Sequence, residues 1–178
     1  MKKVFLTAVC LLLILVSSVN ATFAFFADSD GSFSSISVGQ VGIEFKDEAE
    51  GSNAGNKLLP GVSYAKKPVV RVREGSEDCW LFIALENGIE SIEESGAGSI
   101  AARMEENGWL PLDGVEDVYA YEATVSAGAV LTVFDGFTVS GSATAPEIQS
   151  CSGAQIVLTA YAVQAAGFDS AAAAWTAV

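Results

Sequence analysis

Residues 79–85, CWLFIAL, decide which fold this sequence predicts. In an extended strand successive side chains point to opposite faces, and both faces of this stretch are apolar. The residues of the two faces are Cys79, Leu81, Ile83 and Leu85 on one, and Trp80, Phe82 and Ala84 on the other. A strand without a polar face lies in the centre of a sheet, or another element covers its outer face. We therefore expect a β-protein in which residues 79–85 form an inner strand.

Alternation with a period of two continues on both sides of this stretch, and it is the signal of half-buried strands. Upstream, Val70 and Val72 alternate with Arg71 and Arg73, which predicts a strand with one wet face. Downstream, strand patterns recur at residues 119–125, 129–134, 137–140 and 155–164. About seven to nine short antiparallel strands separated by turns are typical of an all-β protein with an antiparallel β-sandwich.

The alternation changes phase at a glycine near the start of the predicted domain. Ile36 and Val38 alternate, whereas the apolar residues from Val41 to Phe45 alternate one step out of phase with them. A bulge or sharp bend at Gly39 would restore both sets to one face of the sheet.

Between the predicted strands the sequence indicates turns and short helices. Ile100 and Met104 have a helix-like spacing within residues 86–108, so we expect one or two short surface helices there. The pair Asp113-Gly114 signals a hairpin. Residues 140–150 are predicted to form a polar loop.

The C-terminus is rich in alanine and predicts one more short helix. Asp169 can cap this helix at its N-terminus. Phe168 and Trp175 are the large apolar residues that would hold the helix against the sheet.

The N-terminus has the pattern of a secretory signal peptide. Lys2 and Lys3 form a short positive region, and residues 4–19 are a nearly unbroken apolar run. This run is about 16 residues long, shorter than the roughly 20 residues of a transmembrane helix, so a permanent membrane anchor is the weaker alternative. Small residues allow cleavage after Ala21 or Ala24, and we expect Ala24. Cleavage there removes residues 1–24.

The remaining residues 25–178 are enough for a single folded domain. Removing Lys2 and Lys3 from the nine basic residues leaves seven against 22 acidic ones, so the net charge changes from −13 to −15. Such a domain is repelled by nucleic acid and by anionic membranes. Half of the residues are hydrophobic (51%), which argues against disorder. The same self-repulsion predicts that any assembly becomes more favourable as ionic strength or divalent cations increase.

Two cysteines, Cys79 and Cys151, remain after cleavage. Exported proteins retain disulfides, and closing a loop of about 70 residues would stabilise the fold by about 4 kcal/mol. The sequence leaves two alternatives open, a Cys79–Cys151 disulfide or two separately buried thiols.

Residues for catalysis are scarce, because the chain contains no histidine. This excludes Ser-His-Asp and Cys-His pairs and the HExxH zinc site. The acidic residues cluster in predicted loops, where solvated surface charge is the expected role. The aromatic residues Trp80, Phe82, Tyr119 and Tyr121 have strand spacing, so we expect them to pack in the sheet rather than to stack on sugars.

The stretch DSDGS at residues 28–32 begins like a calcium-binding EF-hand loop. Gly39 stands where the bidentate glutamate of such a loop belongs, and no helices flank the stretch. We expect a turn there, with a calcium site as the weaker alternative and no other cofactor.

Several motifs occur together in a characteristic order. These are FAFFADSDGSFSSISVGQVGIEF at 23–45, LLPG at 58–61, PVVRVREGSEDCWLFI at 68–83, GWLPLDG at 108–114 and IVLTAYAVQAAGFDSAAAAW at 156–175. In this order they resemble the bacterial exported proteins with SipW-type signal peptides, the TasA/camelysin family. The resemblance implies a jelly-roll-like sandwich, release by a SipW-like signal peptidase, and a location outside the cell in a biofilm matrix or at the cell surface.

In TasA-like fibres the segment after the cleavage site acts as a donor strand that completes the next subunit. The resemblance assigns this role to residues 25–38. The apolar residues that would contact the acceptor are Phe25, Phe26, Phe33, Ile36 and Val38. Strand addition of this kind uses main-chain hydrogen bonds for affinity and alternate side chains for specificity. The implied partners are further copies of the chain and a minor matrix subunit.

Two other classes of function remain open at the level of sequence. The first is a monomeric binding or adhesion module at the cell surface. The second is a metal-dependent surface protease like camelysin, although a chain without histidine would need an unusual carboxylate and thiolate set to bind zinc. We expect a structural protein rather than an enzyme.

Overall fold

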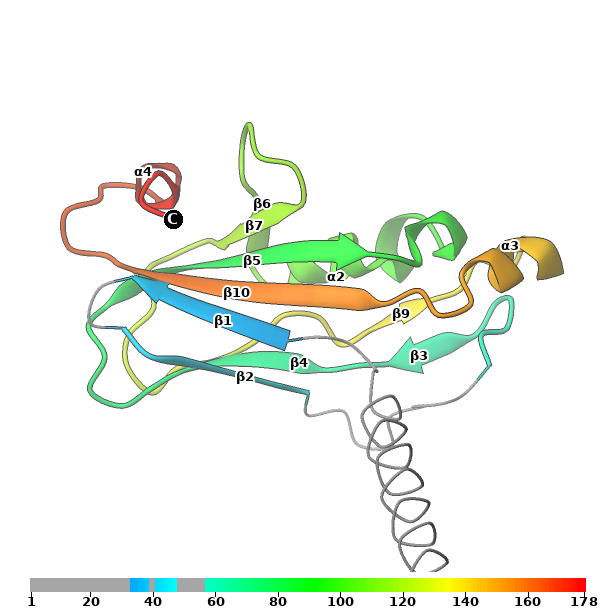
Figure 1. Ribbon diagram of the computed structural model, residues 1–178, viewed down its shortest axis with the longest axis horizontal. Coiled ribbons are helices and arrows are strands. Elements are labelled where there is room, and N and C mark those ends of the chain that lie inside the picture. Colours follow the sequence, from blue (N-terminus) through cyan, green and yellow to red (C-terminus); the bar gives the residue numbers. More distant parts are fainter. Residues whose placement is uncertain (1–32, 39–40, 48–56) are drawn as a thin grey trace, which may run out of the picture. The chain divides into compact units, whose positions relative to one another are not determined.

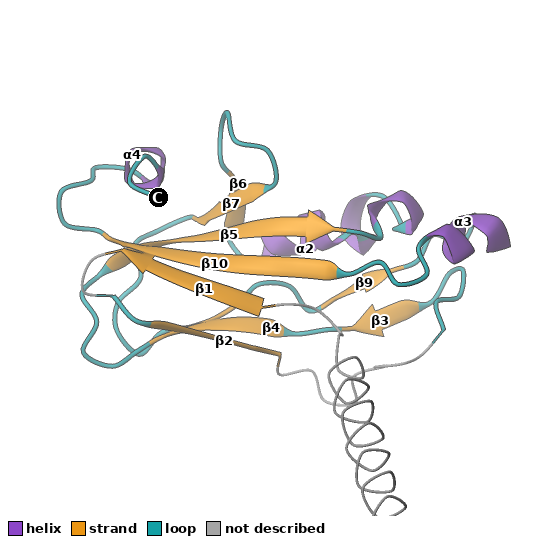
Figure 2. Cartoon of the chain, viewed as in Figure 1, coloured by secondary structure: helices purple, strands orange, loops and turns teal. Residues whose placement is uncertain are grey.

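The computed structural model describes residues 33–38, 41–47 and 57–178, which form a mostly β structure (Figures 1 and 2). The strands are β1 (Phe33–Val38), β2 (Ile43–Asp47), β3 (Ser63–Ala65), β4 (Pro68–Val72), β5 (Cys79–Asn87), β6 (Trp109–Pro111), β7 (Val118–Tyr121), β8 (Val130–Thr132), β9 (Gly136–Thr138) and β10 (Ile156–Gln164). The short helices are η1 (Glu90–Ile92), η2 (Gly96–Gly98), α2 (Ile100–Glu106), α3 (Ala145–Ser150) and α4 (Ala171–Trp175). The expected all-β class is confirmed.

The strands form three sheets. The largest has the order β1-β10-β5-β7-β6, a second has the order β2-β4-β8, and β3 pairs with β9. Between the described strands, all pairs but one are antiparallel, as expected. The exception is β1, which runs parallel to β10. The expectation of antiparallel strands throughout is wrong at this pair, because the first and last strands are not joined by a hairpin and a long connection permits parallel pairing.

Strand β5 lies inside the largest sheet, between β10 and β7, as its two apolar faces predict. On one face, Leu81 and Ile83 are at most 1% exposed and belong to the main core. On the other face, Phe82 is fully buried in a second cluster that also contains Ala174 of α4. Both predicted explanations of this stretch therefore hold, because it is central and its outer face is covered.

The main core lies between the largest sheet and the β2-β4-β8 sheet. Val70 and Val72 of β4 are fully buried in the same cluster as Leu81 and Ile83 of β5, whereas Arg71 of β4 is exposed. The predicted wet face of β4 is thus confirmed at Arg71, whereas Val69 on the same side of the strand is only 2% exposed. Figure 1 shows β2 and β4 lying below β1 and β10, in a separate layer.

Helix α2 forms where the spacing of Ile100 and Met104 predicted a helix. Both side chains are fully buried, and the Ser99 hydroxyl accepts a hydrogen bond from the Ala102 amide as an N-cap. The Asp113-Gly114 turn connects β6 to β7 as expected, with Gly114 at a φ of 78°.

Two expectations about the later helices need correction. Residues 140–150 are not only a loop, because α3 begins there after a capping box in which Thr144 and Glu147 satisfy each other's backbone amides. Helix α3 buries no residue, so it has no apolar period that could reveal it. In α4 the N-cap is Ser170, whose hydroxyl accepts from the Ala173 amide, and not Asp169.

The expected role of the C-terminal aromatic residues is confirmed. The Trp175 ring lies 5.1 Å from that of Phe82 and 5.3 Å from that of Tyr161, measured between centroids. Phe168 packs against the same cluster. The signal peptide, the bend at Gly39 and the DSDGS stretch lie outside the described residues.

Candidate functional site

The candidate functional site is the sheet edge that β1 forms. This strand is the last one in its sheet, and in the described part of the chain its only strand partner is β10. It is also the first described element, immediately after residues 25–32 of the predicted donor segment. Of the expected donor strand 25–38, the last six residues are therefore described, and they pair with their own chain.

The register of β1 matches its largest residue to the largest core residue of β10. Phe33 pairs with Leu158, which is 1% exposed. Ser35 then pairs with Ala160 and Ser37 with Ala162. Ala160 and Ala162 are at most 1% exposed and belong to the main core, so this side of β10 is small and closely packed.

The other two apolar positions of β1 pair with residues of the opposite side of β10. Ile36 pairs with Tyr161 and Val38 with Val163. Val163 is 1% exposed and lies in the second cluster, against which Tyr161 also packs. The expected contact residues Phe33, Ile36 and Val38 are thus register partners of Leu158, Tyr161 and Val163. Phe25, Phe26 and the cleavage site at Ala24 lie outside the described residues.

This arrangement suits the exchange of a strand. An edge strand contributes main-chain hydrogen bonds on one side only, and a parallel pair is slightly less stable than an antiparallel one. If β1 left its place, Leu158, Ala160 and Ala162 of β10 would lose a neighbour beside the main core. An extended segment of another chain with the same order of large and small residues could take that place.

The two cysteines are free and separately buried, which is the second of the two alternatives that the sequence allowed. The Cys79 thiol donates to the Val125 carbonyl at 3.5 Å, and the Cys151 thiol lies 3.6 Å from the Ser91 hydroxyl. Cys79 begins β5, whereas Ser91 lies just beyond its other end, and the nine residues of β5 span about 26 Å. A disulfide requires Cα atoms within about 7 Å, so this fold does not form the Cys79–Cys151 bridge.

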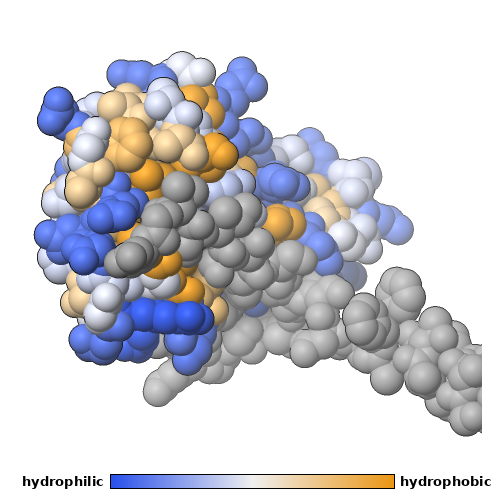
Figure 3. Space-filling view, turned by 60° about the vertical axis from the view of Figure 1, so that its left-hand side comes forward, coloured by the Kyte–Doolittle hydropathy of each residue, from blue (hydrophilic) through white to orange (hydrophobic). Residues whose placement is uncertain are grey.

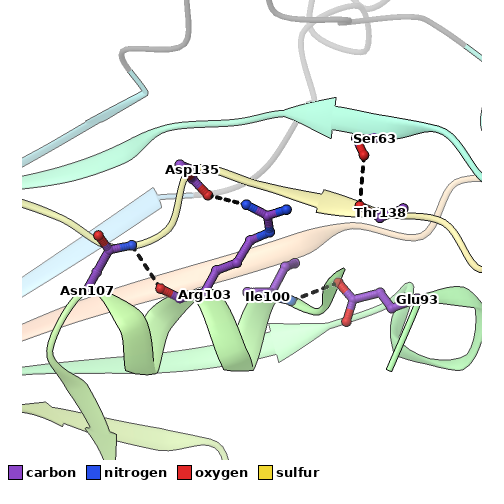
Figure 4. A network of polar contacts seen from close by, with 7 residues as sticks. All are labelled: Ser63, Glu93, Ile100, Arg103, Asn107, Asp135 and Thr138. Carbon is purple, nitrogen blue, oxygen red and sulfur yellow. Dashed lines mark hydrogen bonds and ion pairs between the residues drawn. The ribbon is translucent and has the colours of Figure 1, made fainter. Parts of the chain in front are cut away.

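A polar network holds α2 beside β9 (Figure 4). The Glu93 carboxylate accepts from the Asn87 side-chain amide at 3.0 Å and from the Ile100 backbone amide at 3.4 Å. Arg103 of α2 donates to Asp135 at 2.7 Å. The sequence analysis did not single out these residues, because they come from separate elements and form no local pattern.

Burial raises the pKa of Glu93, and the charge of Glu90 acts in the same direction, although the bonds from Asn87 and Ile100 oppose this shift. The cause is desolvation, which disfavours the charged form of a carboxyl group. Glu93 is therefore a structural carboxylate kept partly away from water, with both of its oxygens already engaged.

Among the described residues, no group of three His, Cys, Asp or Glu side chains is placed to hold a metal ion. Burial, with the nearby charge of Asp78, raises the pKa of the Cys79 thiol to about 11, and a thiol that stays protonated at neutral pH is a poor nucleophile. Across residues 57–178 and the two shorter described segments, helices are too short or too polar to cross a bilayer.

Comparison of the chain with protein-family models, with curated proteins and with solved structures finds no match.

Proposed function

We propose that this protein is an exported structural subunit of an extracellular fibre, of the kind found in biofilm matrices, and that it polymerises by donating its N-terminal strand to the next copy. The observation that supports the proposal is the place of β1. Among the described strands it is the first in the sequence, it lies at a sheet edge, and it is the only one with a parallel partner. The shared core of the two larger sheets fits the jelly-roll-like sandwich that the resemblance implies.

Strand exchange can link copies of the chain into a polymer without forming any new kind of strand pair. The same β10 edge accepts β1 either from its own chain or from a neighbour, so the pairs lost and gained are identical. A contact between the N-terminus of one copy and the β10 edge of the next joins two different surfaces, and such a contact builds an open filament. This assembly would take place outside the cell after a signal peptidase releases residues 25–178, with a minor matrix subunit as a second partner.

The proposal is tested with protein that begins at Phe25. We expect filaments by electron microscopy and high-mass species by size-exclusion chromatography, and we expect neither when residues 25–35 are deleted or when a folded tag blocks the N-terminus. A synthetic peptide of residues 25–38 should inhibit the assembly by occupying the β10 edge. The matched control is the same peptide with Ile36→Asp and Val38→Asp, which should not inhibit.

Two results would contradict the proposal. Protein that lacks residues 25–35 and still assembles like the intact chain would exclude donor-strand addition. Protein that stays monomeric in every form, alone and at high concentration, would instead support a monomeric binding module.

A further inference from the structure

Strands β3 and β4 follow each other closely and share one register with the strands beside them. Ser63 of β3 pairs with Thr138, and Val69 of β4, six residues later, pairs with Thr132, six residues earlier. The two ladders are therefore parts of one antiparallel ladder, in which β3 and β4 form one edge row of the chain and β9 and β8 form the other.

The hydrogen bonds show which residues of this row turn toward β9 and β8. The Val62 carbonyl accepts from the amide just after β9 at 3.0 Å, and the Lys66 amide donates to the carbonyl just before β9 at 3.4 Å. In an antiparallel ladder, residues between such pairs direct their main-chain groups to the opposite side. Arg73 does so, because its amide donates to the Gly42 carbonyl beside β2 at 2.8 Å.

Strand β2 covers only part of this opposite side. It pairs with β4 and ends at Asp47, level with Pro68. Further along, the main-chain N–H and C=O groups of Ser63 and Ala65 point to the same side, and within the described part of the chain they have no partner. Both residues are exposed. We call Ser63 and Ala65 the open edge, because such groups can pair with an added extended segment.

The open edge is held in place by Tyr64, which lies between its two residues and is 6% exposed. The Tyr64 ring stacks on that of Phe137, at 5.4 Å between centroids. Its hydroxyl accepts a hydrogen bond from the Leu59 amide at 2.8 Å and donates one to the Lys57 carbonyl at 3.0 Å. The edge is thus formed before a partner arrives, which lowers the entropic cost of binding.

Two exposed apolar side chains lie in the turn that leads into β3. Leu59 is 50% exposed and Val62 is 38% exposed. At the other end of the molecule, which comes forward in Figure 3, strongly hydrophilic residues in blue separate the apolar ones in orange. A segment that pairs with the open edge and carries large apolar residues would therefore find contacts for them at the start of β3.

The part of the donor segment that precedes β1 has the place and the length to reach the open edge. The open edge continues the row that β2 occupies, and β2 contacts β1, so it lies on the β1 side of the sandwich. In Figure 1, β3 lies beyond the end at which β1 begins, and both arrows point the same way. Residues 25–32 span about 26 Å when extended, whereas crossing between two layers and following a three-residue strand take about 10 Å each.

We propose that residues 25–32 of the donating copy pair with the open edge of the accepting copy, while residues 33–38 pair with its β10. This inference rests on the proposed function, because strand donation brings the segment to the acceptor. The two phenylalanines at the start of the segment then reach Leu59 and Val62. The donor is held at two edges, and the open edge adds main-chain hydrogen bonds to those between β1 and β10.

A proline in the open edge tests this pairing. Ala65→Pro removes the N–H group that faces the donor and leaves the β9 side of the strand unchanged. We expect this variant, beginning at Phe25, to need about a tenfold higher concentration to form filaments than the unmodified protein does, measured by sedimentation. Ala65→Thr is the matched control, because it keeps the N–H group and suits a strand. It should assemble like the unmodified protein, and circular dichroism should show that both variants are folded.

Mixing variants separates accepting from donating. Ala65→Pro still has its own N-terminal strand to donate, whereas a protein that lacks residues 25–32 still has an intact open edge. We expect an equimolar mixture of the two to give mainly heterodimers by size-exclusion chromatography, and no filaments.

Hydrogen exchange measures the pairing directly and does not depend on a variant. The amides of Ser63 and Ala65 should exchange rapidly in monomeric protein that lacks residues 25–32. They should exchange slowly in filaments of the unmodified protein, as measured by mass spectrometry of fragments that contain β3.

Failure of this inference is distinguishable from failure of the proposed function. If filaments form and Ala65→Pro assembles as well as the unmodified protein, the open edge accepts no donor, while strand donation to β10 stands. Rapid exchange of Ser63 and Ala65 in filaments has the same meaning. Slow exchange in the monomer that lacks residues 25–32 would show that another part of the chain covers the edge, and the inference would again be wrong. If the unmodified protein forms no filament, the proposed function fails, and this inference fails with it.

Discussion

The indole nitrogen of Trp109 donates a hydrogen bond to the backbone carbonyl of Thr132, at 2.9 Å. Trp109 belongs to β6, the last strand of the largest sheet, and Thr132 belongs to β8, the last strand of the second sheet. A fully buried side chain thus joins two sheets at the side opposite β1 and β2. The Tyr121 ring packs against the indole edge to face, at 5.2 Å between centroids.

Replacing Trp109 by phenylalanine should destabilise the fold without unfolding it. The substitution removes the only N–H group of the side chain and leaves the Thr132 carbonyl without this donor, which costs about 1–3 kcal/mol for a buried group. Urea denaturation, monitored by circular dichroism, measures the change in the free energy of unfolding. Leu110→Ala serves as the control in the same strand, because Leu110 is 48% exposed and its truncation should have little effect.

Replacing Trp175 by alanine should release α4 from the sheet. The indole contacts both Phe82 and Tyr161, and α4 has only five residues to hold it in place. We expect a loss of about 2 kcal/mol in the free energy of unfolding. Hydrogen exchange should show faster exchange in residues 171–178 while β5 stays protected. Unchanged exchange in this segment would contradict the assignment of Trp175 as its main attachment.

Replacing Glu93 by glutamine should change how stability depends on pH. The folded state raises the pKa of Glu93 above its value in the unfolded chain, so the folded state binds the proton more tightly. The contribution of Glu93 to stability is therefore greatest at acid pH and falls as pH rises through the folded pKa. Glutamine does not titrate, so the free energy of unfolding of Glu93→Gln, relative to the unmodified protein, should increase between mildly acid and neutral pH. Urea unfolding at a series of pH values measures this difference, and a constant offset would show that Glu93 keeps an ordinary pKa.

The thiols should resist modification in the folded protein. Cys79 is fully buried, its pKa is raised to about 11, and Cys151 is 8% exposed. We expect iodoacetamide at pH 7.5 to label neither residue until urea is added. Mass spectrometry measures the extent of labelling. Reducing agent should leave the thermal midpoint unchanged, because the fold contains no Cys79–Cys151 disulfide. A lower midpoint after reduction would contradict the free state of both residues.

Some features of the fold follow from short stretches of sequence. The two apolar faces of residues 79–85 predicted a central, covered strand, and β5 is both. The spacing of Ile100 and Met104 predicted α2. Helix α3 was overlooked although Thr144 and Glu147 form a recognisable capping box, because no apolar period accompanies it.

The candidate site could be predicted only in part. The resemblance directed attention to Phe33, Ile36 and Val38, which do lie in a strand at a sheet edge. Nothing near these residues indicates that they pair with β10, more than 100 residues later in the chain, or that the pair is parallel.

The sequence alone determined those elements that have an apolar period, such as β5 and α2, and their buried sides. The reason is that the alternation of apolar and polar residues acts within a few positions of the backbone. The tertiary structure decided which elements meet. It placed β1 beside β10, joined Trp109 to Thr132, and kept Cys79 and Cys151 at opposite ends of β5. The reason is that strand pairing depends on how the whole core packs, and the chain carries no local signal for contacts between residues so far apart.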